Sequence, residues 1–85
     1  MNPQQIAERI HAGLAGSQAT VSSDDNVHFE AVVVAAAFAG KRALQRHQLV
    51  YATLGAAVGT EIHALALQVF TPEEFAARQG RAHHG

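Results

Sequence analysis

The chain has 85 residues, which allow one small domain with a thin core and leave no room for a deep catalytic cleft. It contains no cysteine, so disulfides, thiol redox motifs and thiolate metal sites built by this chain alone are excluded. The formal net charge of −1 argues against a dedicated nucleic-acid-binding protein, although it is compatible with a local basic patch.

The amino-terminal stretch predicts a helix. Asn2 suits the N-cap, and Pro3 suits the first helical position. Apolar residues then recur every four positions, at Ile6, Ile10 and Leu14. The stretch is too polar for a signal peptide, and no segment approaches the roughly 20 apolar residues that span a bilayer. We therefore expect a cytoplasmic protein that makes no contact with a membrane.

Two strands follow this helix. Residues 18–22 and the β-branched stretch at residues 27–35 are separated by a short polar turn, which predicts an antiparallel hairpin. Alternation along the second strand places His28 on the same face as Glu30, opposite Phe29.

A long helix is predicted after Lys41, following a bend at residues 36–40 with room for an extra helical turn. Its apolar positions step by three and four residues, which predicts one continuous buried face that ends at Gly59. The residues on this face are Leu44, His47, Tyr51, Leu54 and Val58. A histidine at such a position, here His47, more often has a half-buried structural role than a ligand role.

The third strand is predicted over residues 61–70, and clear signals mark the start of a last helix. Thr71 and Glu74 match a capping box, and Phe70 and Phe75 match a hydrophobic staple. The resulting order, α-β-β-α-β-α, predicts an α+β fold with one three-stranded sheet packed against helices.

One domain is expected over residues 1–80. Residues 81–85 are expected to form a disordered tail, in which His83 and His84 are solvated.

The six histidines are the conspicuous ligand-type residues, and His63 is the most unusual of them. It interrupts the apolar run at residues 62–67 and is expected to share a strand face with Leu65 and Leu67. Periodicity leaves a buried structural role and a functional role equally open. Its place at the start of a strand would let the imidazole reach solvent while its backbone stays fixed, and histidine is the commonest metal ligand.

No catalytic motif is present, and we expect no enzyme. The chain has neither a GxSxG nor an HExxH pattern, and Gly40-Lys41 lacks the earlier glycine of a phosphate loop. The turn carboxylates Asp24 and Asp25 are expected to be solvated rather than paired for acid–base chemistry.

Several short motifs, with consistent spacing from His28 to Phe75, resemble those of the BolA-like proteins of the BolA/IbaG type. They are Phe38-Ala39-Gly40-Lys41, Arg46-His47-Gln48, Val50-Tyr51, Ile62-His63-Ala64-Leu65 and Thr71-Pro72-Glu73-Glu74-Phe75. Phe75 stands where that family often has tryptophan. The resemblance implies a class II KH-like fold with a mixed three-stranded sheet. KH domains bind nucleic acid through a GxxG loop. This loop is missing here, because Ala43 stands three residues after Gly40, where the motif requires a second glycine.

The resemblance also implies a function. Such proteins bind monothiol glutaredoxins and share a [2Fe–2S] cluster with the glutaredoxin cysteine and glutathione, in iron–sulfur cluster trafficking or iron and redox regulation. The implied ligand is His63, since imidazole can replace thiolate at one iron, as in Rieske centres. A second ligand is less clear: His28 is the nearest nitrogen donor and Asp25 the nearest carboxylate. The isolated chain is expected to be a monomer without a cofactor.

The family resemblance keeps an alternative open, a DNA-binding transcriptional regulator of stress or cell-shape genes. The supporting feature is a basic cluster at the start of the long helix, formed by Lys41, Arg42, Arg46 and His47. The net charge of −1 ranks this alternative second. A third alternative is a domain that acts through protein contacts alone, without a cluster.

Overall fold

The computed structural model describes residues 1–84, with side chains described through residue 79. The elements in chain order are α1 (Pro3–Gly13), β1 (Gln18–Ser22), β2 (His28–Val34), the short 3-10 helix η1 (Ala36–Phe38), α2 (Ala43–Leu54), the short 3-10 helix η2 (Gly55–Ala57), β3 (Ala64–Phe70) and α3 (Pro72–His84). The predicted order is therefore confirmed, and η1 occupies the bend at residues 36–40. Gly85 and the side chains of residues 80–84 lie outside the described part. The prediction that His83 and His84 are solvated therefore also lies outside it.

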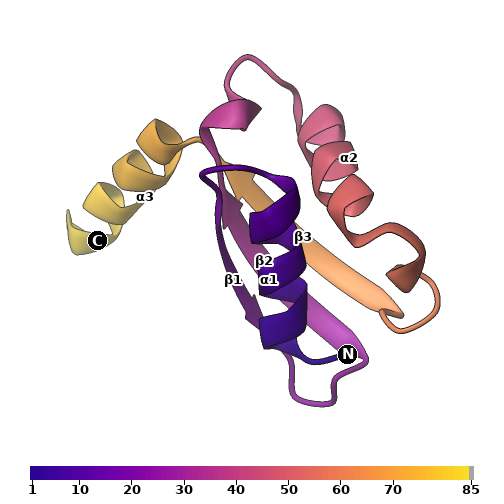
Figure 1. Ribbon diagram of the computed structural model, residues 1–85. Coiled ribbons are helices and arrows are strands. Elements are labelled where there is room, and N and C mark those ends of the chain that lie inside the picture. The colour runs from indigo at the N-terminus through magenta and orange to yellow at the C-terminus, as the bar shows by residue number, and fades with distance from the viewer. Residues whose placement is uncertain (85) are drawn as a thin grey trace.

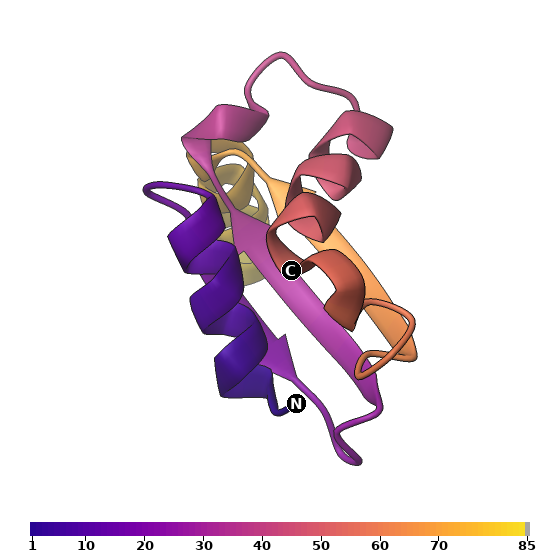
Figure 2. The same ribbon diagram turned by 45° about the vertical axis from the view of Figure 1, so that its right-hand side comes forward.

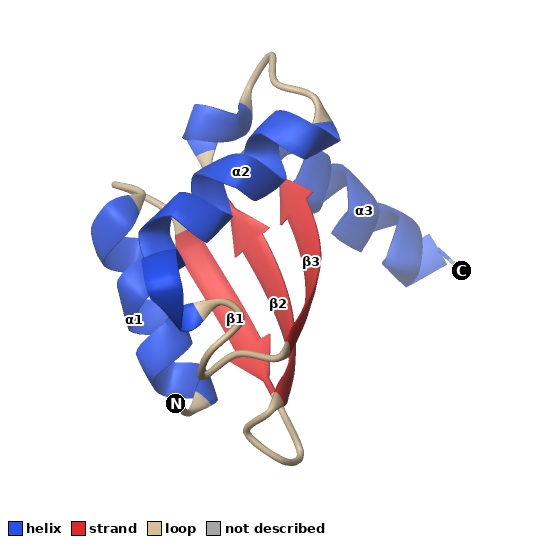
Figure 3. Cartoon of the chain, turned by 90° about the vertical axis from the view of Figure 1, so that its right-hand side faces the viewer, coloured by secondary structure: helices blue, strands red, loops and turns tan. Residues whose placement is uncertain are grey.

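The sheet is mixed, as expected. Its strand order is β1-β2-β3, with β1 antiparallel to β2 and β2 parallel to β3. Helices α1 and α2 lie side by side over one face of this sheet (Figures 1 and 2). Figure 3 shows α3 on the other side of the sheet, beyond the carboxyl end of β3. No helix within residues 1–84 covers the rest of that second face, which we call the open face.

The core lies between the sheet and the pair α1 and α2. In β2 exposed and buried residues alternate at the first four positions, and Phe29, Ala31 and Val33 point into the core while His28 and Glu30 point to the open face. This confirms the predicted faces of the second strand. The other buried hydrophobic residues are Ile6, Ile10, Leu14, Ala35, Phe38, Val50, Leu54, Ala57 and Ile62.

Helix α2 differs from the prediction in its end and in its buried face. It stops at Leu54 because Gly55 takes a positive φ of 57°, which glycine adopts at little cost. Val50 and Leu54 face the core, whereas Leu44 is 69% exposed. The predicted face is therefore wrong at Leu44, Tyr51 and Val58, which are exposed. Because this helix is apolar over a broad arc, its periodicity fits more than one buried face.

Strand β3 also starts later than predicted, at Ala64 instead of residue 61. Residues 58–62 close a tight loop, in which the Gly59 N–H donates to the Ile62 carbonyl at 2.8 Å. This loop buries Ile62 and leaves His63 exposed in a bend before the strand. His63 therefore does not share a strand face with Leu65.

No helix within residues 1–84 combines the length and the apolar character that crossing a bilayer requires.

Candidate functional site

His63 lies on the surface, at the point where the chain enters β3. Its backbone N–H donates to the Val27 carbonyl at 3.2 Å, and the Ala64 N–H shares the same acceptor at 3.4 Å. These bonds fix the backbone of His63 against the start of β2, while its side chain is exposed. Its exposure removes the buried structural role that periodicity left open.

His28 is the first residue of β2 and comes close to the same place. Its register partner in β3 is Ala64, the residue directly after His63. The parallel pairing thus brings the amino-terminal ends of the two strands, and with them the two histidine backbones, to one edge of the sheet. The His28 side chain is 69% exposed and belongs to the open face.

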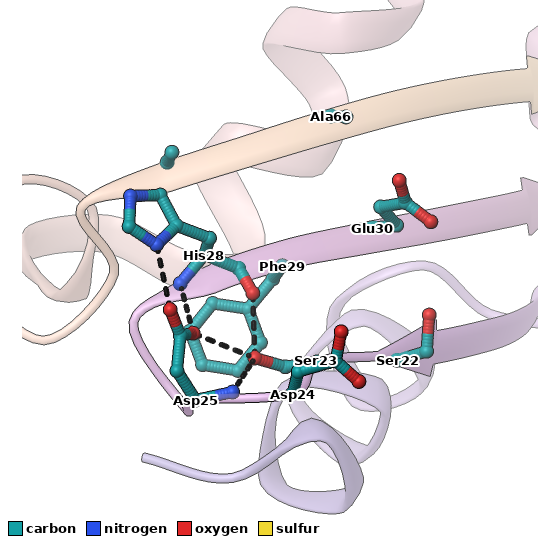
Figure 4. A pocket seen from close by; sticks show the side chains of 9 residues that line it. Ser22, Ser23, Asp24, Asp25, His28, Phe29, Glu30 and Ala66 are labelled. Carbon is teal, nitrogen blue, oxygen red and sulfur yellow. Dashed lines mark hydrogen bonds and ion pairs between the residues drawn. The ribbon is translucent and has the colours of Figure 1, made fainter.

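Asp25 holds the imidazole of His28. Its Oδ2 lies 2.8 Å from the ring Nδ1, and its Oδ1 accepts the backbone N–H of His28 at 2.9 Å (Figure 4). The same Oδ1 accepts the backbone N–H of Val27, also at 2.9 Å. These bonds lower the pKa of the Asp25 carboxyl well below its usual range, chiefly through the ring of His28. Asp25 is exposed, as expected for a turn carboxylate, and its hydrogen bond to the His28 ring is a contact that the expectation did not include.

The turn around Asp25 is fixed by a second side chain. Ser23 Oγ accepts the Asn26 N–H at 2.9 Å and donates to the carbonyl of His28. Asn26 takes a positive φ of 59°, which asparagine tolerates better than most residues. In the sequence, Asp25 stands three residues before His28, and this spacing was the available signal for the contact. Residue types in a turn do not show which groups their side chains bind.

A shallow hollow of about 470 Å³ lies beside this turn on the open face. Small side chains of β3 line it next to His28 and Glu30, and Figure 4 shows Ala66 on this strand. The lining residues are Ser22, Ser23, Asp24, Asp25, His28, Phe29, Glu30, Ala64 and Ala66. Within residues 1–79, no group of three or more His, Cys, Asp or Glu side chains could hold a metal ion. A complete metal site at this turn would need ligands from outside the described side chains.

The basic cluster is divided by the structure. Arg46 forms a bidentate ion pair with Glu74, at 2.6 and 3.2 Å, and its Nε donates to the Lys41 carbonyl at 2.8 Å. Its side chain is only 12% exposed. His47 is half-buried, while the residues Lys41 and Arg42 are exposed. Arg46 is thus committed to contacts within the molecule.

The ion pair perturbs both partners. The Arg46 guanidinium lowers the pKa of Glu74 to about 2, and the Glu74 carboxylate raises the pKa of Arg46. Sequence spacing gives no indication of this contact, because 28 residues separate the two side chains.

Comparison with known sequences identifies close relatives. The family model described as "BolA-like protein" matches residues 7–74. The DNA-binding transcriptional regulator BolA of Haemophilus influenzae is 46% identical over 57 residues, which cover 67% of this chain and 55% of that protein. BolA-like protein 1 of Homo sapiens is 42% identical over 55 residues, covering 65% and 40% respectively. The matched segment spans about half of such relatives.

Solved structures agree over more of the chain. A BolA homologue from Coxiella burnetii superposes with a TM-score of 0.81 at 40% identity, covering 89% of this chain and 97% of that one. The BolA domain of SufE1 from Arabidopsis thaliana gives a TM-score of 0.74 at 29% identity, covering 85% and 93%. Together, the matched residues and the shared fold show that the chain belongs to the BolA-like protein family.

Proposed function

We propose that this chain is a non-enzymatic adaptor that binds a monothiol glutaredoxin and shares a [2Fe–2S] cluster with it, in iron–sulfur cluster trafficking or iron and redox regulation. The observation that supports this proposal best is the placement of His63 and His28. Both side chains are exposed at one edge of the sheet, where the starts of β2 and β3 meet. Neither is needed to fill the core.

The donor set fits a shared cluster and not a cluster held by this chain alone. Clusters of this type are commonly bound by four cysteine thiolates, and imidazoles can replace two of them at one iron. This chain has no thiol, but it can offer the imidazole of His63 and, from the adjoining start of β2, that of His28. The glutaredoxin cysteine and glutathione would supply the soft sulfur ligands. The isolated chain is then a monomer without a cluster, and the complex is a heterodimer.

The proposal is tested by co-expression with a monothiol glutaredoxin, followed by visible absorption and circular dichroism of the purified complex. We expect a coloured complex with the wild-type chain, and His63→Ala to bleach at least about ten times faster, since lost ligands weaken metal affinity strongly. His11→Ala is the matched control, because His11 is exposed and belongs to α1, which packs against β1 and α2. An unchanged spectrum and bleaching rate for His63→Ala would show that the ligand is another residue. A colourless wild-type complex would contradict the shared cluster itself and favour a role through protein contacts alone.

A DNA-binding transcriptional regulator is the second candidate function. It is favoured by the similarity to the DNA-binding transcriptional regulator BolA of Haemophilus influenzae, and by the exposure of Lys41 and Arg42. It ranks second because Arg46 is already paired and the net charge is −1.

A further inference from the structure

The two ring nitrogens of His28 have different surroundings. Nδ1 faces the Asp25 carboxylate at 2.8 Å, and Figure 4 shows the other nitrogen turned away from Asp25. An ionised carboxylate can only accept hydrogen bonds, so Nδ1 must carry the proton of a neutral ring. The lone pair of the neutral ring is then on Nε2. In metal sites, an outer carboxylate of this kind sets the tautomer and the orientation of a ligating histidine.

We propose that Asp25 is a positioning residue, which holds His28 as the Nδ1–H tautomer and so presents its Nε2 lone pair at the edge of the open face as a ligand nitrogen. The tautomer is a property of the isolated chain. The ligand role rests on the proposed function, and it makes His28 the second imidazole ligand beside His63.

Because of the hydrogen bonds in this turn, only a carboxylate at position 25 should hold His28 as the Nδ1–H tautomer. Asp25 Oδ1 already accepts two backbone N–H groups, from Val27 and His28. In Asp25→Asn the side-chain oxygen should keep these two bonds, because the opposite orientation would set the amide NH₂ against two donors. The NH₂ group then faces the ring and donates to Nδ1. The proton of the neutral ring must move to Nε2, and the lone pair that faces outward is lost.

The direct test is long-range ¹H–¹⁵N NMR of the imidazole rings in the isolated chain, at a pH where the rings are neutral. The His28 signals are assigned by their absence in His28→Gln. We expect the Nδ1–H tautomer in the wild type and the Nε2–H tautomer in Asp25→Asn. Asp24→Asn is the matched control, since it removes the same charge from the same turn and Asp24 makes no side-chain hydrogen bond within the described residues. It should keep the wild-type tautomer.

A wild-type ring in the Nε2–H form would overturn the proposal without any variant, and so the test does not depend on the folding of Asp25→Asn. The proposal would also be overturned if a folded Asp25→Asn variant showed the same His28 tautomer as the wild type. Backbone amide spectra report whether β2 keeps its fold in the variant.

The second readout is the cluster in the glutaredoxin complex. We expect Asp25→Asn to weaken cluster retention about ten- to a hundredfold, in the same direction as His28→Ala, while Asp24→Asn has no effect. If the tautomer inverts but the cluster is unaffected, His28 is not a ligand and that half of the proposal is wrong. If the wild-type complex holds no cluster, the proposed function fails, whereas the NMR result on the tautomer still stands.

Discussion

At the scale of single residues, Gly13 shows how a small side chain permits a close helix contact. Gly13 is the last residue of α1, and a Cβ placed on it would lie 2.6 Å from Cγ2 and 2.9 Å from Cβ of Thr53 in α2. Real Cβ atoms essentially never approach other atoms so closely. The sequence suggests only that a glycine here ends the first helix, and the contact gives a second and stronger reason for it.

We therefore expect Gly13→Ala to lower the free energy of unfolding by about 1–2 kcal/mol. Overpacking costs about 1–3 kcal/mol, and the gain in helix propensity of up to about 1 kcal/mol is reduced at a helix end. Urea unfolding followed by circular dichroism measures the change. Thr53→Ser removes the clashing methyl group and keeps the hydroxyl that donates to the Val50 carbonyl at 2.6 Å. In the double variant the loss should be partly recovered, and strictly additive effects would show that this contact is not the cause.

The candidate site was only partly predictable at this scale. Alternation along a strand is a local property, and it places His28 on the open face correctly. The position of His63 depends on the loop at residues 58–62, whose closing bond between Gly59 and Ile62 moves the strand start by three residues. The Asp25–His28 contact depends on the path of the turn, which residue types alone do not specify.

At the scale of elements, α3 is attached through its first turn. The Thr71 N–H donates to Glu74 Oε1 at 2.9 Å and the Glu74 N–H to Thr71 Oγ1 at 3.2 Å, which confirms the predicted capping box. The rings of Phe70 and Phe75 lie 5.7 Å apart, as expected for the predicted staple. Such signals are predictable because they act over a few residues. The ion pair from Arg46 in α2 to Glu74 adds a long-range attachment that local signals cannot indicate.

This attachment should depend on pH. The pKa of Glu74 falls from 4.5 to about 2 on folding, so its stabilising contribution is complete above about 4.5 and is lost as the pH falls through about 2. We expect Glu74→Gln to melt at a lower temperature than the wild type at neutral pH, and this difference to shrink between about pH 5 and pH 2. Thermal unfolding followed by circular dichroism measures both curves. Glu73→Gln, an exposed neighbour in the same turn, should follow the wild type. A difference that stays constant over this pH range would contradict the role of the Glu74 charge.

At the scale of the whole molecule, the sheet has a covered face and an open face, and function is proposed at the edge of the open one. The α+β order and the mixed sheet could be predicted because hairpins and crossovers follow from connection lengths and local patterns. The open face was harder to predict, since β3 has apolar residues on both sides, with Ala64 and Ala66 exposed and Leu65 and Leu67 half-buried. Alanine and leucine side chains can be buried on either side of a sheet. Only the packing of α1 and α2 decides which side of β3 is covered.

The charge distribution of the whole molecule also limits DNA binding. Of the basic cluster, Lys41 and Arg42 are exposed, while Arg46 is paired with Glu74. The two exposed cations of this cluster would release few counterions, so we expect the cluster to bind a labelled DNA duplex no tighter than about 10⁻⁶ M near physiological salt. Any residual affinity should fall with salt at a logarithmic slope no steeper than about −1.8, and it should be lost in Lys41→Ala/Arg42→Ala. Fluorescence anisotropy over a salt series measures both values. Sub-micromolar affinity with a steeper slope would require additional phosphate contacts, and it would place the transcriptional regulator ahead of the cluster-binding adaptor.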